Sequence, residues 1–477
     1  MQPTFFWYDY ETWGTDPARD RVCQFAGLRT DWDLNPVGQP LTLYCRPAED
    51  MLPQPAACLI TGMTPQKALA EGLCEAEFFA HIHQEMARPS TCTAGFNNLR
   101  FDDEFTRYGL YRNFFDPYGR EWRYGNSRWD LIDVVRLTHA LRPEGIEWPK
   151  GEDGATSFRL ERLTEANGIP HVGAHDALAD VRATIAVARL IRDRQPRLFD
   201  YTLQLREKRK AAELLDLKTM QPVLHVSSKF PAAQGCISPV VPLARHPTNN
   251  NGIIVYDLRV DPTPLLELPV AEVHRRLFSS REALGEGVER VPLKTVHLNK
   301  SPMLAPLSTL SPQAAERWGI DHRTMERHLA ALRQATGLAE KIQAVHTQKA
   351  FPPTSDPDLN LYGGGFFSDA DRRRMDEIRH TKPEALGRFP LVFDDRRIPE
   401  LLFRYRARNW PETLSANERK AWDEYRRIRL TAADGGGSLP LSGYRKELAR
   451  LMVEPGLMPG QRDILSQLAD WPKAIGL

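Results

Sequence analysis

The stretch TFFWYDYE (Thr4–Glu11) holds the residues on which both the fold and the chemistry depend. Its aromatic run predicts a buried strand, because aromatic side chains favour strands. Residues two apart in a strand point to the same face, so Asp9 and Glu11 project side by side. Two carboxylates this close repel each other, and a divalent cation with oxygen ligands relieves that repulsion. An exposed acidic strand end is the alternative, since Asp-x-Glu alone is common.

Around this strand the pattern is that of an α/β domain. Two further strands, expected to form an antiparallel meander with the first, lie at Arg21–Thr30 and Leu41–Cys45. A buried strand is expected at Thr91–Phe96. Helical periodicity covers Ala76–Met86, Phe101–Arg112, Trp129–Leu141 and Asp176–Asp193. The last helix has Asp176 as its expected N-cap and an apolar stripe at Val181, Ile185, Ala188 and Ile191.

Two more acidic motifs follow at element ends. Asp102 and Asp103 come at the start of the expected helix Phe101–Arg112, where acids also serve as helix caps. His175 and Asp180 have the spacing H-x4-D at the start of the next expected helix. Five helical residues turn through roughly 140° beyond one revolution, so we expect His175 just before the helix and Asp180 one turn inside it. A surface histidine beside a solvated aspartate is the alternative.

The three motifs together predict a metal-dependent phosphodiesterase. They occur in order on elements that can converge at one end of a sheet. Two metal ions held ~4 Å apart by such carboxylates can clamp an in-line attack on phosphate. The histidine is then placed to accept a proton from the attacking water.

Bulk properties limit the class of protein. The 477 residues predict two or three domains. The net charge of +1 shows no basic excess, which leaves either no polyanion partner or a basic groove balanced elsewhere. The six cysteines form no C-x-x-C pair, and we find no secretory or membrane-spanning segment, so we expect a reduced, cytoplasmic protein without membrane contact. The glycine run Gly363–Gly365 is no P-loop, because no Gly-Lys-Ser/Thr follows it.

The sequence pattern changes after Gln195-Pro196, where we expect a domain boundary. Pro222–Leu310 contains short β runs, with the best strands at Ile253–Leu258 and Lys294–Asn299. Helices return over Pro312–Ala344. Further helices are expected at Arg372–Arg379, Arg396–Asn409 and Asn417–Arg429. A β-rich domain followed by a helical one is therefore expected behind the α/β domain.

The motifs resemble those of the DEDDh exonucleases, in which H-x4-D marks the histidine branch, and more specifically the bacterial exodeoxyribonuclease I family. The likeness runs nearly end to end. It rests on DYETWGTDPARDR (Asp9–Arg21), LPQPAACLITGMTPQ (Leu52–Gln66), GFNNLRFDDE (Gly95–Glu104), NSRWDLIDVVR (Asn126–Arg136), SFRLERLTEANGI (Ser157–Ile169), AHDALADVRATIA (Ala174–Ala186), RQPRLFDY (Arg194–Tyr201), GFFSDADR (Gly365–Arg372) and LLFRYRARNWP (Leu401–Pro411).

The resemblance implies three parts arranged as a clamp around single-stranded DNA. They are a ribonuclease H-like α/β exonuclease domain (1–195), a Src-homology-3-like β-barrel domain with helical additions (196–350) and a helical C-terminal domain (351–477). The implied activity is magnesium-dependent, processive hydrolysis of single-stranded DNA from the 3′ end, releasing 5′-mononucleotides in DNA repair and recombination. The implied enzyme is a monomer that binds two Mg²⁺ ions, with Mn²⁺ as a substitute.

The resemblance also implies individual roles. Asp9, Glu11 and Asp180 would bind one magnesium, Asp9 and Asp102 the second, and His175 would be the general base. The implied DNA contacts, besides Glu11, are Tyr10, Thr12, Arg107, Trp122, Arg136, Phe158, Arg159, Lys294 and His297. From residue type alone, Phe158 fits a core position equally well and Arg136 an ordinary surface helix position.

A protein partner is implied as well. Arg142 and Tyr201 match positions that bind the acidic tail of the single-stranded DNA-binding protein, although Pro306–Ser311 lacks polar or basic residues expected of that site. Two alternatives remain for the function. One keeps the chemistry but acts on RNA or a mismatched primer end, and the other is a nucleic-acid clamp without turnover.

Overall fold

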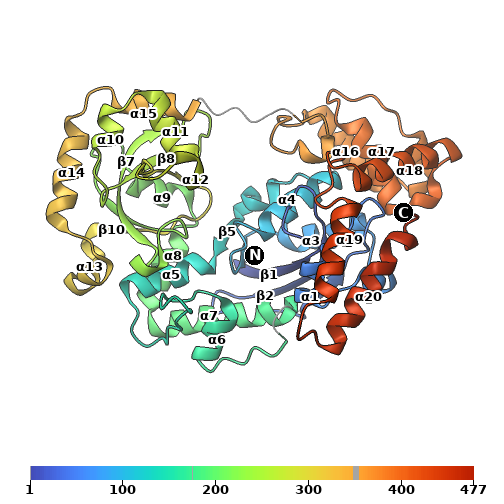
Figure 1. Cartoon of the computed structure of the whole chain (residues 1–477), viewed down its shortest axis with the longest axis horizontal. Coiled ribbons are helices and arrows are strands. Elements are labelled where there is room, and N and C mark those ends of the chain that lie inside the picture. The colour runs from blue at the N-terminus through green and yellow to red at the C-terminus, as the bar shows by residue number, and fades with distance from the viewer. Residues whose placement is uncertain (1, 174–175, 348–353) are drawn as a thin grey trace. The chain divides into compact units, whose positions relative to one another are not determined.

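The computed structural model of the chain describes residues 2–173, 176–347 and 354–477 (Figure 1). It contains two compact units. The first unit comprises Met1–Ser127, His171–Arg182 and Pro353–Leu477, so both ends of the chain contribute to it. The second unit comprises Arg128–Pro170 and Ala183–Pro352.

A five-stranded sheet carries the start of the chain, with strand order β3-β2-β1-β4-β5. Its strands are β1 (Thr4–Thr12), β2 (Val22–Thr30), β3 (Leu41–Tyr44), β4 (Thr91–Gly95) and β5 (Ser127–Asp130). β1 pairs antiparallel with β2, and β2 antiparallel with β3, which confirms the expected meander. β4 pairs parallel with β1 on its other side. The strand that carries Asp9 and Glu11 is therefore central in the sheet.

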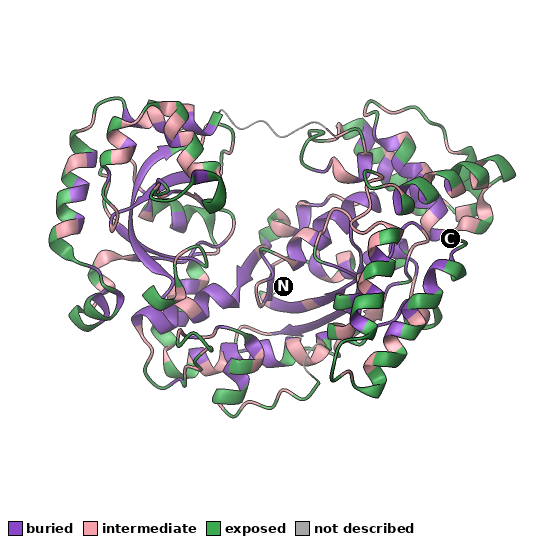
Figure 2. Cartoon of the chain, viewed as in Figure 1, coloured by how far each residue is buried: buried purple, intermediate pink, exposed green. Residues whose placement is uncertain are grey.

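Aromatic packing fixes this sheet against its helices. The helices of this region are α1 (Pro55–Thr61), α2 (Pro65–Glu71), α3 (Glu75–Met86) and α4 (Asp102–Arg112). Phe78 and Phe79 of α3 share one buried cluster with Phe6 and Phe25 of the strands. Strands β1, β2 and β4 are mostly or fully buried, while the outer helix faces are exposed (Figure 2). Burying each such ring contributes roughly 1.5–3 kcal/mol, which explains why the aromatic run decides the fold.

Two expectations for helices had different outcomes. α7 (Ala177–Arg194) begins beside Asp176, whose Oδ1 accepts from the backbone N–H of Leu178 at 3.2 Å, and its expected apolar stripe is buried. The helix expected over Trp129–Leu141 was too long, because Trp129 and Asp130 belong to β5. α5 (Leu131–Leu141) starts only after Asp130, which caps it by accepting from Ile132 N–H at 3.2 Å.

Helices from the C-terminal part complete the first unit. They are α16 (Asp369–His380), α17 (Ile398–Asn409), α18 (Ala416–Thr431), α19 (Leu441–Met452) and α20 (Pro459–Ala474). Tyr108 and Tyr111 of α4 share a buried cluster with Met375 and Leu401 of α16 and α17. The apolar contacts thus join the two ends of the chain around α4.

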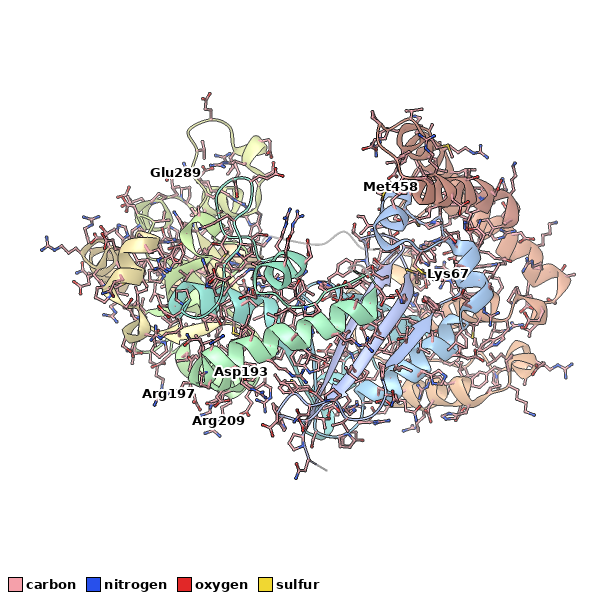
Figure 3. The ribbon with its side chains drawn as sticks, turned by 90° about the horizontal axis from the view of Figure 1, so that it is seen from below. Lys67, Asp193, Arg197, Arg209, Glu289 and Met458 are labelled. Carbon is pink, nitrogen blue, oxygen red and sulfur yellow. The ribbon has the colours of Figure 1, made fainter. Side chains whose placement is uncertain are left out.

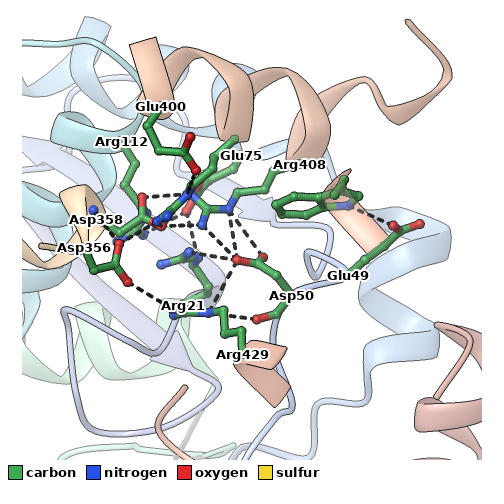
Figure 4. Close-up of polar contacts among 12 residues, drawn as sticks. Arg21, Glu49, Asp50, Glu75, Arg112, Asp356, Asp358, Glu400, Arg408 and Arg429 are labelled. Carbon is green, nitrogen blue, oxygen red and sulfur yellow. Dashed lines mark hydrogen bonds and ion pairs between the residues drawn. The ribbon is translucent and has the colours of Figure 1, made fainter. Parts of the chain in front are cut away.

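A buried ion-pair network joins the same two ends (Figure 4). The Arg408 guanidinium lies 2.8 Å from Asp50 Oδ2 and 2.5 Å from Asp358 Oδ2. Arg429 Nε also donates to the Asp50 carbonyl at 3.2 Å. On the other side, Arg112 donates to Glu75 at 2.8 Å. Buried charges persist only when paired, so this network fixes how the C-terminal helices dock.

The second unit contains a five-stranded antiparallel sheet of strand order β10-β6-β7-β8-β9. Its strands are β6 (Val223–Val226), β7 (Ile237–Arg245), β8 (Gly252–Asp257), β9 (Leu293–His297) and β10 (Leu304–Pro306). Its helices, besides α5 and much of α7, are α6 (Leu160–Ala166), α8 (Pro196–Gln204), α9 (Lys208–Leu214), α10 (Thr263–Glu267), α11 (Val270–Phe278), α12 (Arg281–Leu284), α13 (Pro312–Trp318), α14 (His322–Gln334) and α15 (Leu338–Thr347). Three of them, α10 to α12, interrupt the region whose sequence had suggested only short β runs.

The basic stretch Arg206–Lys210 forms an ordinary solvated surface. Arg209 projects outward from α9, and Arg197 from α8 (Figure 3). Arg209 and Lys210 both pair with Glu213, at 3.2 Å and 3.4 Å. Such exposed pairs contribute about 0–1 kcal/mol. Separately, no helix among the described residues has the length and apolar character needed to cross a bilayer.

Candidate active site

Three carboxylates from two elements converge in the first unit. Asp9 and Glu11 project from the same face of β1, as the strand period requires. Asp180 comes from the first turn of α7. One ligand oxygen from each lies within 4.8 Å of the others. Three carboxylate oxygens at this spacing are a suitable ligand set for a hard divalent cation.

The neighbours Asp102 and Asp103 have separate environments at the start of α4. Asp103 is fully buried, accepts a hydrogen bond from the Tyr8 hydroxyl at 2.6 Å and pairs with Arg120 at 2.5 Å. Asp102 accepts from the backbone N–H of Tyr10, between Asp9 and Glu11, at 3.2 Å. Asp102 therefore faces the carboxylate cluster, whereas Asp103 anchors α4 to the sheet and to Arg120.

The electrostatics of this cluster call for a cation. Burial, the Asp102 carboxylate and then Glu11 raise the pKa of Asp9 well above its usual range. Burial and the carboxylates of Asp180 and Asp102 raise the pKa of Glu11 to about 9. Each negative charge disfavours the next, and the described neighbours of Glu11 that shift its pKa are all acidic. A divalent ion with oxygen ligands supplies the missing positive charge, so the residues present fit such an ion.

Sequence reasoning missed two polar side chains beside this cluster. His171 Nε2 lies 2.6 Å from Asp180 Oδ1. Gln24 of β2 donates from Nε2 to Asp176 Oδ2 at 3.1 Å. The only sequence signal for His171 is its position four residues before His175, and the predicted general base His175 itself lies outside the described residues. His171 and Gln24 orient the carboxylates at the start of α7.

The predicted DNA contacts of the first unit fall into two groups. Tyr10 and Thr12 are buried, and the Thr12 hydroxyl donates to the Gly14 carbonyl at 2.7 Å. Arg107 is also buried, and its guanidinium donates through Nε and Nη2 to Glu121 and through Nη1 to Glu104. Trp122 is 64% exposed. Of these four, only the Trp122 ring is open to a ligand; Arg107 is held as part of the scaffold.

The predicted contacts of the second unit are similarly diverse. Phe158 is buried against His139, with the Arg136 guanidinium 5.7 Å from its ring centroid. Arg159 is exposed just before α6. Lys294 of β9 lies 4.9 Å from the Phe230 ring centroid. Burial and the nearby positive charges of Lys300, His246 and Lys294 lower the pKa of His297 to about 4, so at neutral pH His297 offers hydrogen bonds but no charge.

The two predicted partner contacts meet the same segment of the second unit. Arg142 Nη1 donates to the Thr309 carbonyl at 3.2 Å. The Tyr201 hydroxyl donates to the Leu304 carbonyl at 2.9 Å. Both residues thus border the segment Leu304–Thr309, which includes part of the stretch where the sequence departs from the expected pattern.

Comparison with known families covers almost the whole chain. The family model described as Exonuclease matches residues 6–188, Exonuclease I SH3-like domain matches 206–348, and Exonuclease I C-terminal domain matches 355–475. The predicted fold class, an α/β exonuclease domain followed by an SH3-like and a C-terminal domain, is confirmed.

Individual relatives agree. Exodeoxyribonuclease I of Escherichia coli (strain K12) is 50% identical over 455 residues, which are 95% of this chain and 94% of the relative. Exonuclease I from Methylocaldum szegediense superposes with a TM-score of 0.95 at 55% identity and covers 99% of each chain. The zinc-bound E. coli exonuclease I–single-stranded DNA complex superposes with a TM-score of 0.94 at 48% identity and covers 100% of each. The chain is an exonuclease and belongs to the exodeoxyribonuclease I family.

Proposed function

We propose that this protein is a magnesium-dependent exodeoxyribonuclease that removes 5′-mononucleotides from the 3′ end of single-stranded DNA. The observation that carries the proposal is the convergence of Asp9, Glu11 and Asp180, with Asp102 facing them from α4. Carboxylates with raised pKa values, such as those of Asp9 and Glu11, are typical of a functional site. The alternative of a clamp without turnover is disfavoured, because the complete acidic set is retained.

Each carboxylate has a role in this proposal. Asp9, Glu11 and Asp180 would hold one ion, and Asp9 and Asp102 would serve a second. Two Mg²⁺ ions, or Mn²⁺ in their place, would supply Lewis-acid chemistry there, activating water and offsetting negative charge on the phosphate. The protein's part is to keep the carboxylates fixed. The Tyr10 N–H orients Asp102, and His171 orients Asp180. His175 accepts the proton of the attacking water.

The substrate is assigned by likeness to relatives. The zinc-bound E. coli structure was solved with single-stranded DNA. The domain division 1–195, 196–350 and 351–477 provides surfaces beyond the catalytic domain on which a strand can be retained between cleavage steps, so we propose processive digestion by a monomer. The proposed role is in DNA repair and recombination.

The proposed protein partner is the acidic C-terminal tail of the single-stranded DNA-binding protein. Arg142 supplies a guanidinium and Tyr201 an aromatic ring at the segment Leu304–Thr309. Arginine recognises carboxylates with strong, charge-assisted hydrogen bonds. An Arg142→Ala variant that binds the tail peptide as tightly as the wild type would exclude this surface.

A comparison of substrates tests the proposed activity. We expect mononucleotide release from single-stranded DNA with Mg²⁺, much slower release from an RNA oligonucleotide of the same sequence, and none in EDTA. Equal rates on DNA and RNA would favour the RNA-trimming alternative. Binding of DNA without turnover in Mg²⁺ or Mn²⁺ would favour the clamp.

A further inference from the structure

The face of α3 that carries Ala76, Ala80 and Gln84 borders a cavity within the first unit. These residues lie four apart, so they follow one another along a single face of the helix. The cavity has a volume of about 460 Å³. Its other walls come from Phe115, the end of α16, and Tyr405 and Trp410 at α17. Cavities of this size hold small organic molecules rather than single ions.

Aromatic rings form the walls of this cavity and are fixed by their neighbours. The Tyr405 ring lies edge-on to Trp410, with a centroid distance of 5.3 Å and an interplanar angle of 80°. Its other neighbour is Phe114, at a centroid distance of 5.1 Å. The His83 ring lies 4.6 Å from Phe115, tilted by 35°. The walls are therefore preformed, and they are suited to a planar aromatic ligand.

Two polar side chains of the lining lack hydrogen-bond partners within the described ranges of the chain. Tyr405 is only 5% exposed, yet its hydroxyl makes no hydrogen bond with any described residue. The half-buried imidazole of His83 makes none there either. Buried hydroxyls nearly always have a partner. Both groups line the cavity, so a molecule inside it is placed to supply the missing partners.

These two polar groups are neutral at neutral pH. Burial and then the positive charges of Arg379 and Arg120 lower the pKa of His83 to about 4, so its imidazole offers one donor and one acceptor. Burial raises the pKa of the Tyr405 hydroxyl, which stays protonated. Arg379 also lines the cavity, but it is already paired with Asp376. The cavity thus selects by hydrogen bonding and shape rather than by charge.

A nucleobase is the kind of ring that fits this lining. Its flat faces stack on aromatic side chains, and its edge carries neighbouring donors and acceptors. A hydrocarbon ring would leave Tyr405 and His83 without partners. At the rim, the exposed side chains of Glu77 and Gln84 offer further hydrogen bonds of the kind that sugar hydroxyls accept and donate.

We propose that this cavity binds a free purine nucleoside or its 5′-monophosphate, with His83 and Tyr405 hydrogen-bonded to the edge of the base. None of the lining residues belongs to the carboxylate cluster of Asp9, Glu11 and Asp180. The site therefore does not depend on the proposed function. The same base occurs in free nucleosides and in the mononucleotides of the proposed reaction, and the test separates these two sources.

The test is calorimetric titration of deoxyadenosine and of its 5′-monophosphate in EDTA. We expect deoxyadenosine to bind the wild type at one site. Ala80→Trp should bind it at least about tenfold more weakly, because the indole occupies the cavity. Equal affinity for both ligands supports a nucleoside as the occupant, and tighter binding of the monophosphate supports a mononucleotide. Binding of the monophosphate at the carboxylate cluster would persist in Ala80→Trp and is so distinguished.

A second variant removes a single hydrogen bond and leaves the fold intact. Tyr405→Phe deletes a hydroxyl that contacts no described partner, so we expect a melting temperature at or above that of the wild type. Its Kd for deoxyadenosine should rise about fivefold. Ala469→Trp, at an exposed alanine of α20 outside the cavity, should keep the wild-type Kd. Deoxyribose 5-phosphate, which has no base, should not bind the cavity.

Three outcomes would overturn the proposal. The first is no binding of either ligand to the wild type at millimolar concentration. The second is the same Kd for deoxyadenosine in Ala80→Trp as in the wild type. The third is full affinity in Tyr405→Phe, which would remove the hydrogen bond on which the choice of ligand rests. Failure of the proposed function is a separate observation, since it is measured as the absence of mononucleotide release from single-stranded DNA.

Discussion

Two adjacent aspartates at the start of α4 have different roles, one at the candidate metal site and one in the core. Asp102 faces Asp9 and accepts from the Tyr10 N–H, while Asp103 pairs with Arg120 in the core. Successive helical residues point about 100° apart, so neighbours naturally face different surroundings. One position serves chemistry and the next serves stability, which separates two effects that usually confuse the interpretation of active-site variants.

We expect Asp102→Asn and Asp103→Asn to differ in kind. Asp102→Asn should lower kcat about 100-fold or more while leaving the melting temperature near that of the wild type. Asp103→Asn should cost about 3–5 kcal/mol of stability, because it leaves the Arg120 guanidinium buried without its counter-charge. Activity assays and urea denaturation check the pair. Equal losses of stability in both variants would contradict this division of roles.

Asp9 lowers the stability of the metal-free protein. Its carboxylate is crowded by Asp102, Glu11 and Asp180, which raise its pKa together with burial. We expect Asp9→Asn to be more stable than the wild type in EDTA by about 1 kcal/mol, since one like charge is removed. Mg²⁺ should raise the melting temperature of the wild type but hardly that of the variant. If the variant is less stable than the wild type in EDTA, repulsion at Asp9 does not destabilise the metal-free protein, and the argument is wrong.

Among the elements, those with strong local patterns were predictable from sequence. β1 followed from its aromatic run, and α7 from its cap Asp176 and its apolar stripe. β5 is only four residues long and leads directly into α5, so its side chains fitted the helical pattern. The helices α10 to α12 lie among prolines and glycines whose local signal suggested loops.

In the candidate site, too, features set by local sequence were predictable and those set by tertiary contacts were not. The spacing of Asp9 and Glu11 placed both on one face, because strand geometry is local. Which of Asp102 and Asp103 faces the site depends on Tyr8 and Arg120, because both donate to Asp103. Neither contact is local in the sequence. The contact of His171 with Asp180 and the docking of Tyr362 on α4 are tertiary for the same reason. Local patterns reveal candidates, and long-range contacts decide between them.

The packing of α3 on α4 depends on one glycine. A Cβ added at Gly109 would lie 1.9 Å from Cζ of Phe79, which is fully buried. Alanine favours a helix by about 1 kcal/mol over glycine, but displacing the Phe79 ring costs about 1–3 kcal/mol. We therefore expect Gly109→Ala to destabilise the protein in urea denaturation. Gly460→Ala in α20, where a Cβ meets nothing within 4 Å, should be neutral or stabilising. If Gly109→Ala is at least as stable as Gly460→Ala, the Phe79 ring can move aside at little cost, and the prediction is wrong.

For the whole molecule, the first unit joins both ends of the chain through charge as well as apolar packing. Asp50 and Asp358 lie buried between guanidiniums of Arg21, Arg404, Arg408 and Arg429. Burial raises the pKa of Asp50, but Arg408, Arg21 and Arg429 outweigh it and hold that pKa well below its usual range. The catalytic sheet and the C-terminal helices are therefore expected to unfold together.

The network predicts a sensitivity to acid. A carboxyl whose pKa is depressed in the folded state stabilises the fold above its unfolded pKa of about 4, and this contribution is lost as pH falls further. We expect the free energy of unfolding to fall steeply below about pH 4, and Asp50→Asn to flatten that slope. Glu424→Gln, which removes an exposed partner of Arg427, should leave the slope unchanged. An Asp50→Asn profile parallel to that of the wild type would contradict the argument.

The central claim is that the carboxylate cluster hydrolyses single-stranded DNA from the 3′ end, and an end-labelled oligonucleotide tests it most directly. With Mg²⁺ and wild-type protein, we predict that a 3′-terminal label appears at once as a mononucleotide. A 5′ label should remain on progressively shorter strands, and Asp9→Asn should release neither. Early release of the 5′ label, or full activity in Asp9→Asn, would contradict the account.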